Sequence, residues 1–292
     1  SWRMRTSTRW QSREGHVTKI DYEAEYNNRR RVPEHTEIMA RWAEQSARVR
    51  STVRCELDQP YGPGPRNRYD LFLPAGEAAN NAPLVVYIHG GYWQRGDRAD
   101  YSFVAEVLVG KGAAVALPSY TLCPEATVAQ IIEEMRQFVR TIWTRMNRRP
   151  VIVGHSAGGH LAAALLATDW VKYDLPSDVI RAAYSISGVF ALEPLIPTSL
   201  NEALRLTPEA ARESSPILWP PPPADRVFVA AVGGAESQEF LRQSLEITAA
   251  WSAAGVKAEC IVIPHANHFT VVDELTRPES AMVFRVLQLA QQ

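Results

Sequence analysis

Apolar residues along positions 68–264 follow two alternating patterns. Short apolar runs typical of buried strands are separated by longer stretches in which apolar residues recur at helical spacing. The apolar runs predict strands at residues 68–74, 84–88, 113–120, 150–154, 179–188, 226–234 and 257–264. The helical spacing predicts helices at residues 31–51, 127–146, 158–170 and 238–255. Strands that alternate with helices in this way predict an α/β fold with a mostly parallel sheet covered on both faces.

The predicted elements define one domain at residues 20–292 with a tail at residues 1–19 that we expect to lie outside it. A Pro-rich segment with short helical pieces, at about residues 191–225, interrupts the alternation. Insertions between core strands of α/β folds often cover the ligand cleft, since function is concentrated in such loops. A passive surface loop is the alternative interpretation.

Composition and charge exclude several classes of protein. The 292 residues are 46% hydrophobic and 22% charged, with a net charge of −1, which argues against a broad nucleic-acid footprint. The basic run "NNRRRVP" at residues 27–33 is interpreted as a solvated helix face plus a loop. No apolar run reaches the ~18 residues of a membrane span, and the first residues lack the apolar core of a signal peptide. We therefore expect a cytoplasmic protein without a membrane or nucleic-acid partner.

A nucleophile motif follows the strand predicted at residues 150–154. The sequence Gly154-His155-Ser156-Ala157-Gly158 matches G-x-S-x-G between a β-branched strand and an apolar helix. That context is the one in which the motif forms a tight turn and exposes the serine above the sheet, as in the α/β-hydrolase fold. Small residues are required on both sides of the turn. Ser156 is therefore the predicted nucleophile.

A serine nucleophile needs a base and an acid, which in this architecture follow it in the order acid, then histidine. The last strand is followed by His265 and His268, and His268 is preferred because it lies further out in the loop. The acid should follow the strand at residues 226–234, which favours Glu236. Asp225 precedes that strand and lies at the wrong end. Glu239 is the fallback, although it belongs to the following helix.

Paired glycines after the strand at residues 84–88 predict an oxyanion hole. Gly90 and Gly91 leave room for an oxyanion beside backbone N–H groups, and Ala157 would supply a second amide. The aromatic residues Tyr92 and Trp93 follow directly. They are predicted to flank an aromatic substrate by stacking, with structural packing as the alternative.

Four motifs resemble the kynurenine formamidase (arylformamidase) family of α/β-hydrolases. They are "HGGYWQ" at residues 89–94, "GHSAGGHLAA" at 154–163, "GAESQEFLRQS" at 234–244 and "NHF" at 267–269. The resemblance implies Ser156 as nucleophile, His268 as base, Glu236 as acid where eukaryotic members usually have Asp, and no cofactor. Esterases similar to hormone-sensitive lipase share "HGG" and the serine turn, but Tyr-Trp after "HGG" favours the formamidases.

The resemblance implies hydrolysis of an N-formyl aryl amide, with N-formyl-L-kynurenine as the favoured substrate. A carboxylesterase, amidase or carbamate hydrolase acting on another aryl ester or amide is an alternative, because fold and triad would be the same. A catalytically inactive binding protein is a distant alternative, since it would be expected to lack a triad member. The three widely spaced cysteines and the histidines match no metal-binding spacing, so no metal is expected. Whether the chain forms a homodimer is left open.

Overall fold

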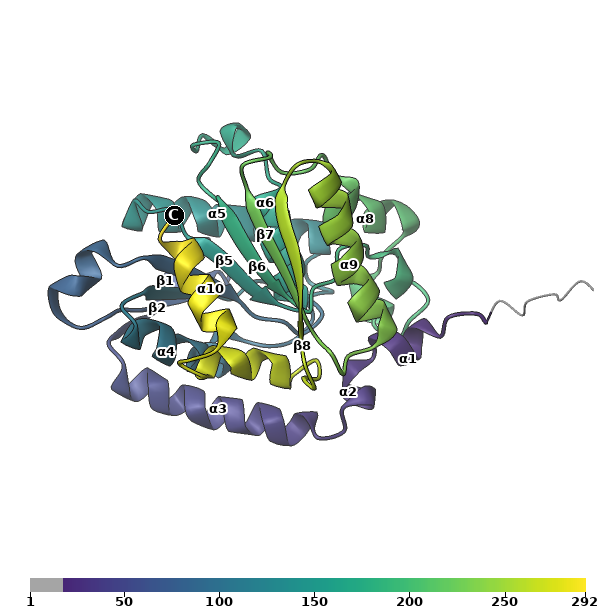
Figure 1. Ribbon diagram of the computed structural model, residues 1–292, viewed down its shortest axis with the longest axis horizontal. Helices are drawn as coiled ribbons and strands as arrows, with labels where there is room; N and C mark the ends of the chain where they lie inside the picture. The colour runs from purple at the N-terminus through teal and green to yellow at the C-terminus, as the bar shows by residue number, and fades with distance from the viewer. Residues whose placement is uncertain (1–17) are drawn as a thin grey trace, which may run out of the picture.

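A single eight-stranded sheet forms the centre of the protein. The computed structural model describes residues 18–292, so residues 1–17 of the predicted tail lie outside the described part. The strands follow the order β1-β2-β4-β3-β5-β6-β7-β8 (Figure 1). They span Cys55–Pro60 (β1), Arg68–Phe72 (β2), Leu84–Ile88 (β3), Ala114–Pro118 (β4), Val151–His155 (β5), Ala182–Ile186 (β6), Val227–Gly233 (β7) and Lys257–Ile263 (β8).

Strands β3 to β8 are mutually parallel, whereas β1 and β2 extend the sheet as an antiparallel pair at the β4 side. Because the six parallel strands point the same way, the loops after their carboxyl ends gather along one edge of the sheet. The segments that follow β3, β5, β7 and β8 are the ones that carry the predicted site. The α/β-hydrolase fold predicted from the sequence is confirmed.

Helices cover both faces of the sheet (Figure 1). One face packs against α3, α4 and α10, and the other against α1, α5, α6 and α9. The helices span Tyr22–Tyr26 (α1), Asn28–Arg31 (α2), His35–Thr52 (α3), Ala105–Gly110 (α4), Val128–Met146 (α5), Ala157–Leu166 (α6), Asn201–Leu204 (α7), Pro208–Glu213 (α8), Gln238–Ala253 (α9) and Ala281–Ala290 (α10). None of those within residues 18–292 is long and apolar enough to cross a bilayer.

The predicted strands and helices are all present, with ends that differ by a few residues. Elements that the pattern did not predict are the edge strand β1 and the helices α1, α2, α4 and α10. Strand β1 is half-buried, with alternating partly buried and exposed residues and a bulge in its pairing with β2. Helices α1 and α2 have only five and four residues, too few for a helical period to stand out.

The Pro-rich segment at residues 191–225 forms α7, α8 and the short 3-10 turns Glu193–Leu195 and Pro216–Leu218. Its apolar side chains, including Leu195, Leu204 and Ala211, join the core on the α6 face of the sheet. At its tip, the backbone N–H and hydroxyl of Ser199 donate to the Glu23 carboxylate at 2.7 and 2.6 Å. The segment is therefore fastened to α1, far away in the sequence.

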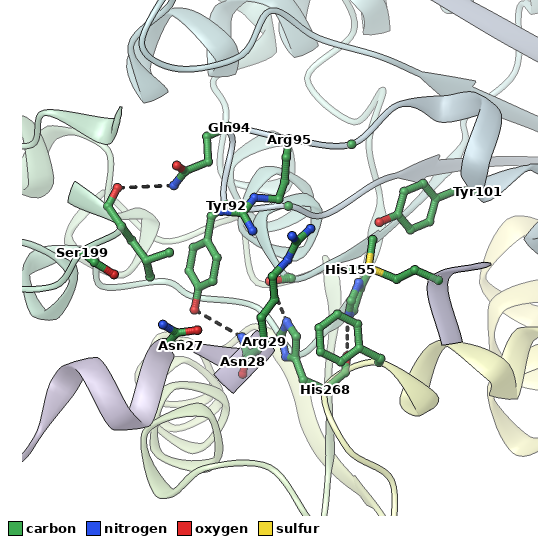
Figure 2. Close-up of a pocket in the computed structure, with 16 residues that line it drawn as sticks. Asn27, Asn28, Arg29, Tyr92, Gln94, Arg95, Tyr101, His155, Ser199 and His268 are labelled. Carbon is green, nitrogen blue, oxygen red and sulfur yellow. Dashed lines mark hydrogen bonds between the residues drawn. The ribbon is translucent and has the colours of Figure 1, made fainter. Parts of the chain in front are cut away.

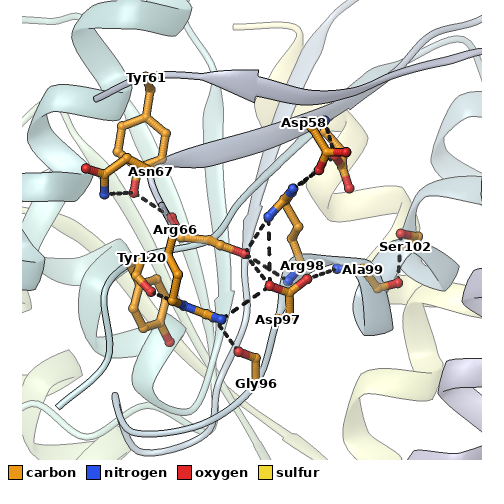
Figure 3. A network of polar contacts seen from close by, with 12 residues as sticks. Asp58, Tyr61, Arg66, Asn67, Gly96, Asp97, Arg98, Ala99, Ser102 and Tyr120 are labelled. Atoms are coloured by element: carbon orange, nitrogen blue, oxygen red, sulfur yellow. Dashed lines mark hydrogen bonds and ion pairs between the residues drawn. The ribbon is translucent and has the colours of Figure 1, made fainter. Parts of the chain in front are cut away.

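Arg66 fixes the path of the chain after β3 (Figure 3). Its guanidinium donates to the backbone oxygen of Gly96 at 2.5 Å and to that of Tyr120 at 2.8 Å. Arg66 belongs to the turn between β1 and β2, whereas Gly96 ends the glycine-containing loop that follows β3. The antiparallel strand pair therefore anchors a loop that reaches the carboxyl edge of the sheet.

A second arginine anchors the same segment through a buried carboxylate. Asp70 on β2 is 0% exposed and accepts hydrogen bonds from Arg98 at 3.1 Å, from Arg50 at 2.5 Å and from the Asp58 N–H at 2.9 Å. Arg98 also pairs with the Asp58 side chain, as Figure 3 shows. Three partners satisfy a charge that would be costly to bury alone.

Replacing Arg98 by alanine is expected to lower the free energy of unfolding by about 3 kcal/mol, because it leaves the buried Asp70 carboxylate with one cation fewer. Urea unfolding followed by circular dichroism measures the change. Arg212→Ala, which removes the exposed ion pair with Glu209, should cost less than about 1 kcal/mol. Equal losses for both variants would contradict a structural role of the buried pair.

Candidate active site

Ser156 lies at a sharp turn between β5, which ends at His155, and α6, which begins at Ala157. Its backbone has φ 58° and ψ −113°, a conformation that costs a non-glycine residue about 1–3 kcal/mol. The serine side chain is 2% exposed. Its backbone N–H donates to the Ile186 oxygen at 2.8 Å at the end of the neighbouring strand, which holds the strained turn in place.

Two glycines allow this turn to form. A Cβ added to Gly158 would lie 1.9 Å from the backbone oxygen of Ile88, and one added to Gly154 would lie 1.9 Å from the Gly158 oxygen. Both distances are far below any van der Waals contact, so α6 approaches β3 as closely as its backbone permits. The motif's requirement for small residues thus has a direct steric cause.

Three side chains from three loops meet above the sheet edge. The Nε2 atom of His268 lies 3.0 Å from the Ser156 Oγ, and its Nδ1 atom lies 2.6 Å from the Glu236 Oε1. His268 is 5% exposed and Glu236 is 7% exposed. The structure therefore brings together the serine, histidine and acid selected from the sequence, in the geometry of a catalytic triad.

The Glu236 carboxylate is held on its far side as well. Its Oε2 atom accepts a hydrogen bond from the Ser187 hydroxyl at 2.5 Å and one from the Gly233 N–H at 2.7 Å. Ser187 follows β6 and Gly233 ends β7. The longer glutamate side chain is therefore folded back against the strand ends, which leaves Oε1 aimed at His268.

The other candidates for base and acid lie elsewhere. His265 is exposed in the turn directly after β8. Glu239 lies on α9, where it pairs with Arg242 and accepts the Tyr26 hydroxyl at 2.9 Å. Asp225 precedes β7 at the opposite edge of the sheet, where its exposed carboxylate contacts Arg226.

The glycine loop after β3 packs directly against the serine turn. A Cβ on Gly90 would lie 2.8 Å from the His155 oxygen and 3.1 Å from the Ser156 Cβ. Gly91 has φ 115° and lines the cavity described below. Within residues 18–292, the backbone N–H groups of Gly91 and Ala157 donate no hydrogen bond, so both are available to an acceptor beside Ser156.

The two aromatic residues predicted to contact substrate have different environments. Tyr92 lines the cavity, and its hydroxyl donates to the Tyr26 oxygen at 2.5 Å. Trp93 is 0% exposed and lies in the core, where its indole N–H donates to His160 Nδ1 at 3.2 Å. Trp93 does not line the cavity, so the predicted stacking of its ring on substrate is not supported, and the packing alternative describes it.

A cavity of about 370 Å³ opens at Ser156 and His268 (Figure 2). Its volume is within the range of small-molecule sites. Its remaining side chains come from the segment after β3, the end of β5, the segment after β8, α3, the tip of the 191–225 segment and the N-terminal residues before α3. They include Asn27, Asn28, Arg29, Met39, Tyr92, Gln94, Arg95, Tyr101, His155, Ser199, Leu200 and Phe269.

The N-terminal wall was not foreseen from the sequence. Asn27, Asn28 and Arg29 belong to the basic run interpreted as solvated, yet they face the catalytic residues across the cavity. That interpretation was therefore wrong for Asn28, which is buried, whereas Arg29 is exposed on α2 and lines the cavity as well. The local sequence does not show that residues 27–29 line a cavity. Their position depends on the hydrogen bond from the Tyr92 hydroxyl to the Tyr26 oxygen, 66 positions apart.

Three buried histidines near the site stay neutral. Burial lowers the pKa of His89 and of His160 to about 4, and it lowers the pKa of His155 well below its ordinary value. His155 Nε2 lies 2.6 Å from the backbone oxygen of His268, a distance that requires it to donate and so positions the loop of the base. No cluster of metal-ligating side chains exists among residues 18–292.

The chain is similar to several known proteins. The family model BD-FAE matches residues 69–185. Kynurenine formamidase of Danio rerio is 34% identical over 78% of this chain and 79% of its own length, and that of Drosophila melanogaster is 30% identical over 75% and 76%. A crystal structure from Silicibacter sp. TM1040, provisionally described as a thioesterase, is 34% identical with a TM-score of 0.81 over 92% of this chain and 100% of that one. An esterase of Pyrobaculum calidifontis, at 19% identity and TM-score 0.67 over 88% and 91%, shares the fold.

The fold, the serine turn and these relatives define the protein as a hydrolase of the α/β-hydrolase class. Within that class the chain belongs to the kynurenine formamidase family, as the sequence motifs had predicted.

Replacing Gly158 by alanine is expected to lower the free energy of unfolding by about 3 kcal/mol or more, because its methyl group would collide with the Ile88 carbonyl. Thermal or urea unfolding measures this. Gly110→Ala is the matched control, since a Cβ there meets nothing within 4 Å and the residue ends helix α4. This control should be neutral or slightly stabilising, and a similar loss in both variants would contradict the steric argument.

Proposed function

We propose that this protein hydrolyses an N-formyl aryl amide, with N-formyl-L-kynurenine as substrate, by a Ser156-His268-Glu236 triad. The main support is the chain of contacts in which His268 lies 2.6 Å from Glu236 Oε1 and 3.0 Å from Ser156 Oγ. Beside it, the backbone N–H groups of Gly91 and Ala157 donate no hydrogen bond within residues 18–292. Membership of the kynurenine formamidase family supports the choice of a formamide.

In the proposed reaction the Ser156 Oγ attacks the formyl carbon while His268 Nε2 takes the hydroxyl proton. The negative charge on the carbonyl oxygen is stabilised by the N–H groups of Gly91 and Ala157, with Gly90 leaving space beside them. His268 then gives its proton to the aniline nitrogen, and the C–N bond breaks. Water, deprotonated by His268, attacks the formyl carbon; the bond from that carbon to Ser156 Oγ then breaks, His268 returns the proton to Oγ, and formate leaves. Glu236 stabilises the imidazolium throughout.

The cavity suits an aromatic leaving group. Tyr92, Tyr101 and Phe269 line it, so that an aryl ring bound there meets aromatic surfaces. The formyl group is the smallest acyl group, and the 2% exposure of Ser156 favours a small acyl group at the nucleophile. We therefore assign the contacts with the substrate ring to Tyr92, Tyr101 and Phe269, and none to Trp93.

The test compares hydrolysis of N-formyl-L-kynurenine with that of a short-chain p-nitrophenyl ester, using Ser156→Ala as the inactive control. The proposal expects a kcat/KM for the formamide of ~10⁴ M⁻¹s⁻¹ or above and no activity in the variant. Turnover of the ester alone would favour the second candidate, a carboxylesterase or amidase with the same triad. That candidate is supported by the esterases that share the fold.

Glu236→Gln is expected to reduce kcat on the order of 10⁴-fold, because an amide neither stabilises the imidazolium nor fixes its tautomer. Steady-state kinetics on the better of the two substrates measures the loss, with circular dichroism as a check on folding. Asp225→Asn, at the opposite edge of the sheet, should leave kcat unchanged. Comparable activity of Glu236→Gln and wild type would exclude Glu236 as the acid of the triad.

A further inference from the structure

The side chains of two arginines line the cavity, Arg29 exposed to solvent and Arg95 partly buried. Arg29 reaches in from α2, and Arg95 reaches in from the loop after β3; Figure 2 shows both heads in the space between Tyr92 and His268. The backbone N–H of Arg95 donates to the backbone oxygen of Gly91 at 3.1 Å. The same loop therefore carries this cation and a glycine of the predicted oxyanion hole. The two cations therefore lie close to the proposed reaction centre.

Neither cation has an acidic partner within residues 18–292. The side chains of Arg29 and Arg95 form no ion pair or hydrogen bond there, and the lining of the cavity contains no Asp or Glu. The nearby Glu23 carboxylate is occupied by two hydrogen bonds from Ser199. Most other arginines within residues 18–292 pair with a carboxylate; Arg98 pairs with three and Arg242 with two.

This unpaired arrangement is unfavourable in the protein alone. Burial, and then the positive charge of Arg29, lower the pKa of Arg95. Two like charges that share a partly buried space repel each other, and the repulsion is relieved when an anion binds between them. Planar guanidinium groups match a carboxylate in two-point geometry.

We propose that Arg29 and Arg95 form a subsite for a carboxylate on the leaving group of the substrate. The inference rests on the proposed function for the identity of that leaving group, since the amino-acid side of N-formyl-L-kynurenine carries such a carboxylate. Selectivity then comes from pairing charge in the same cavity in which Ser156 attacks the formyl group.

The experiment measures kcat/KM for N-formyl-L-kynurenine and for its methyl ester, which has nearly the same shape without the negative charge. Wild type, Arg29→Gln, Arg95→Gln and the control Arg30→Gln are compared. Arg30 is exposed on the same short helix, as Arg29 is, but it does not line the cavity. The acid-over-ester preference should fall about tenfold or more in the Arg29 and Arg95 variants, through KM, and stay at the wild-type value in Arg30→Gln.

A second measurement does not depend on formamidase activity. L-Kynurenine and its methyl ester are tested as inhibitors of p-nitrophenyl acetate hydrolysis by the same four proteins. The acid should inhibit wild type more strongly than the ester, and the difference should shrink in the two variants and at high salt. If the acid inhibits more strongly than the ester in this way but no formamide is hydrolysed, the proposed substrate is wrong and the carboxylate subsite is supported.

Equal losses for acid and ester would show general damage to the cavity and would overturn the subsite. An acid preference that both variants retain would overturn it as well, since the carboxylate would then be recognised elsewhere.

Discussion

The close approach of helix α6 to strand β3 is the constraint on which the site depends. Gly154 and Gly158 let the backbone pass where no Cβ fits, and this tight turn puts Ser156 in its strained conformation at the sheet edge. All other catalytic distances follow from that position. His268 and Glu236 come from loops after β8 and β7, whose ends are fixed by parallel pairing in the same sheet. The parallel sheet therefore fixes the relative positions of three side chains that lie far apart in the sequence.

The loop after β3 complements this framework from the other side. Its glycines pack against the serine turn, and its far end is held by Arg66 and by Arg98 through the buried Asp70. A loop with successive residues at positive φ, from Gly91 to Trp93, needs such anchoring, because its own conformation stores strain. The salt-bridged strand pair β1–β2 thus supports the candidate oxyanion hole even though it contributes no residue to it.

The sequence predicted the residues of the candidate triad better than those of the cavity wall. Ser156, Glu236 and His268 were found because each follows a strand whose apolar run is visible in the sequence, and parallel strands bring their ends together. The interpretations of Trp93 and Asn28 were wrong for the converse reason. Whether an aromatic next to a glycine pair faces the cavity or the core depends on the φ of single residues. Whether a basic run meets solvent or a cavity depends on hydrogen bonds spanning more than 60 residues.

The cavity wall formed by residues 27–29 lies outside the sheet and also outside residues 69–185, where the family model matches. Of the two arginines proposed to bind a carboxylate, Arg29 therefore lies apart from the serine turn in the sequence, whereas Arg95 shares a loop with Gly91. Mutations in the N-terminal stretch touch neither the serine turn nor the strands that place the triad. Substitutions at residues 27–29 can therefore reshape one wall of the cavity without altering the serine turn, and likeness confined to residues 69–185 says nothing about that wall.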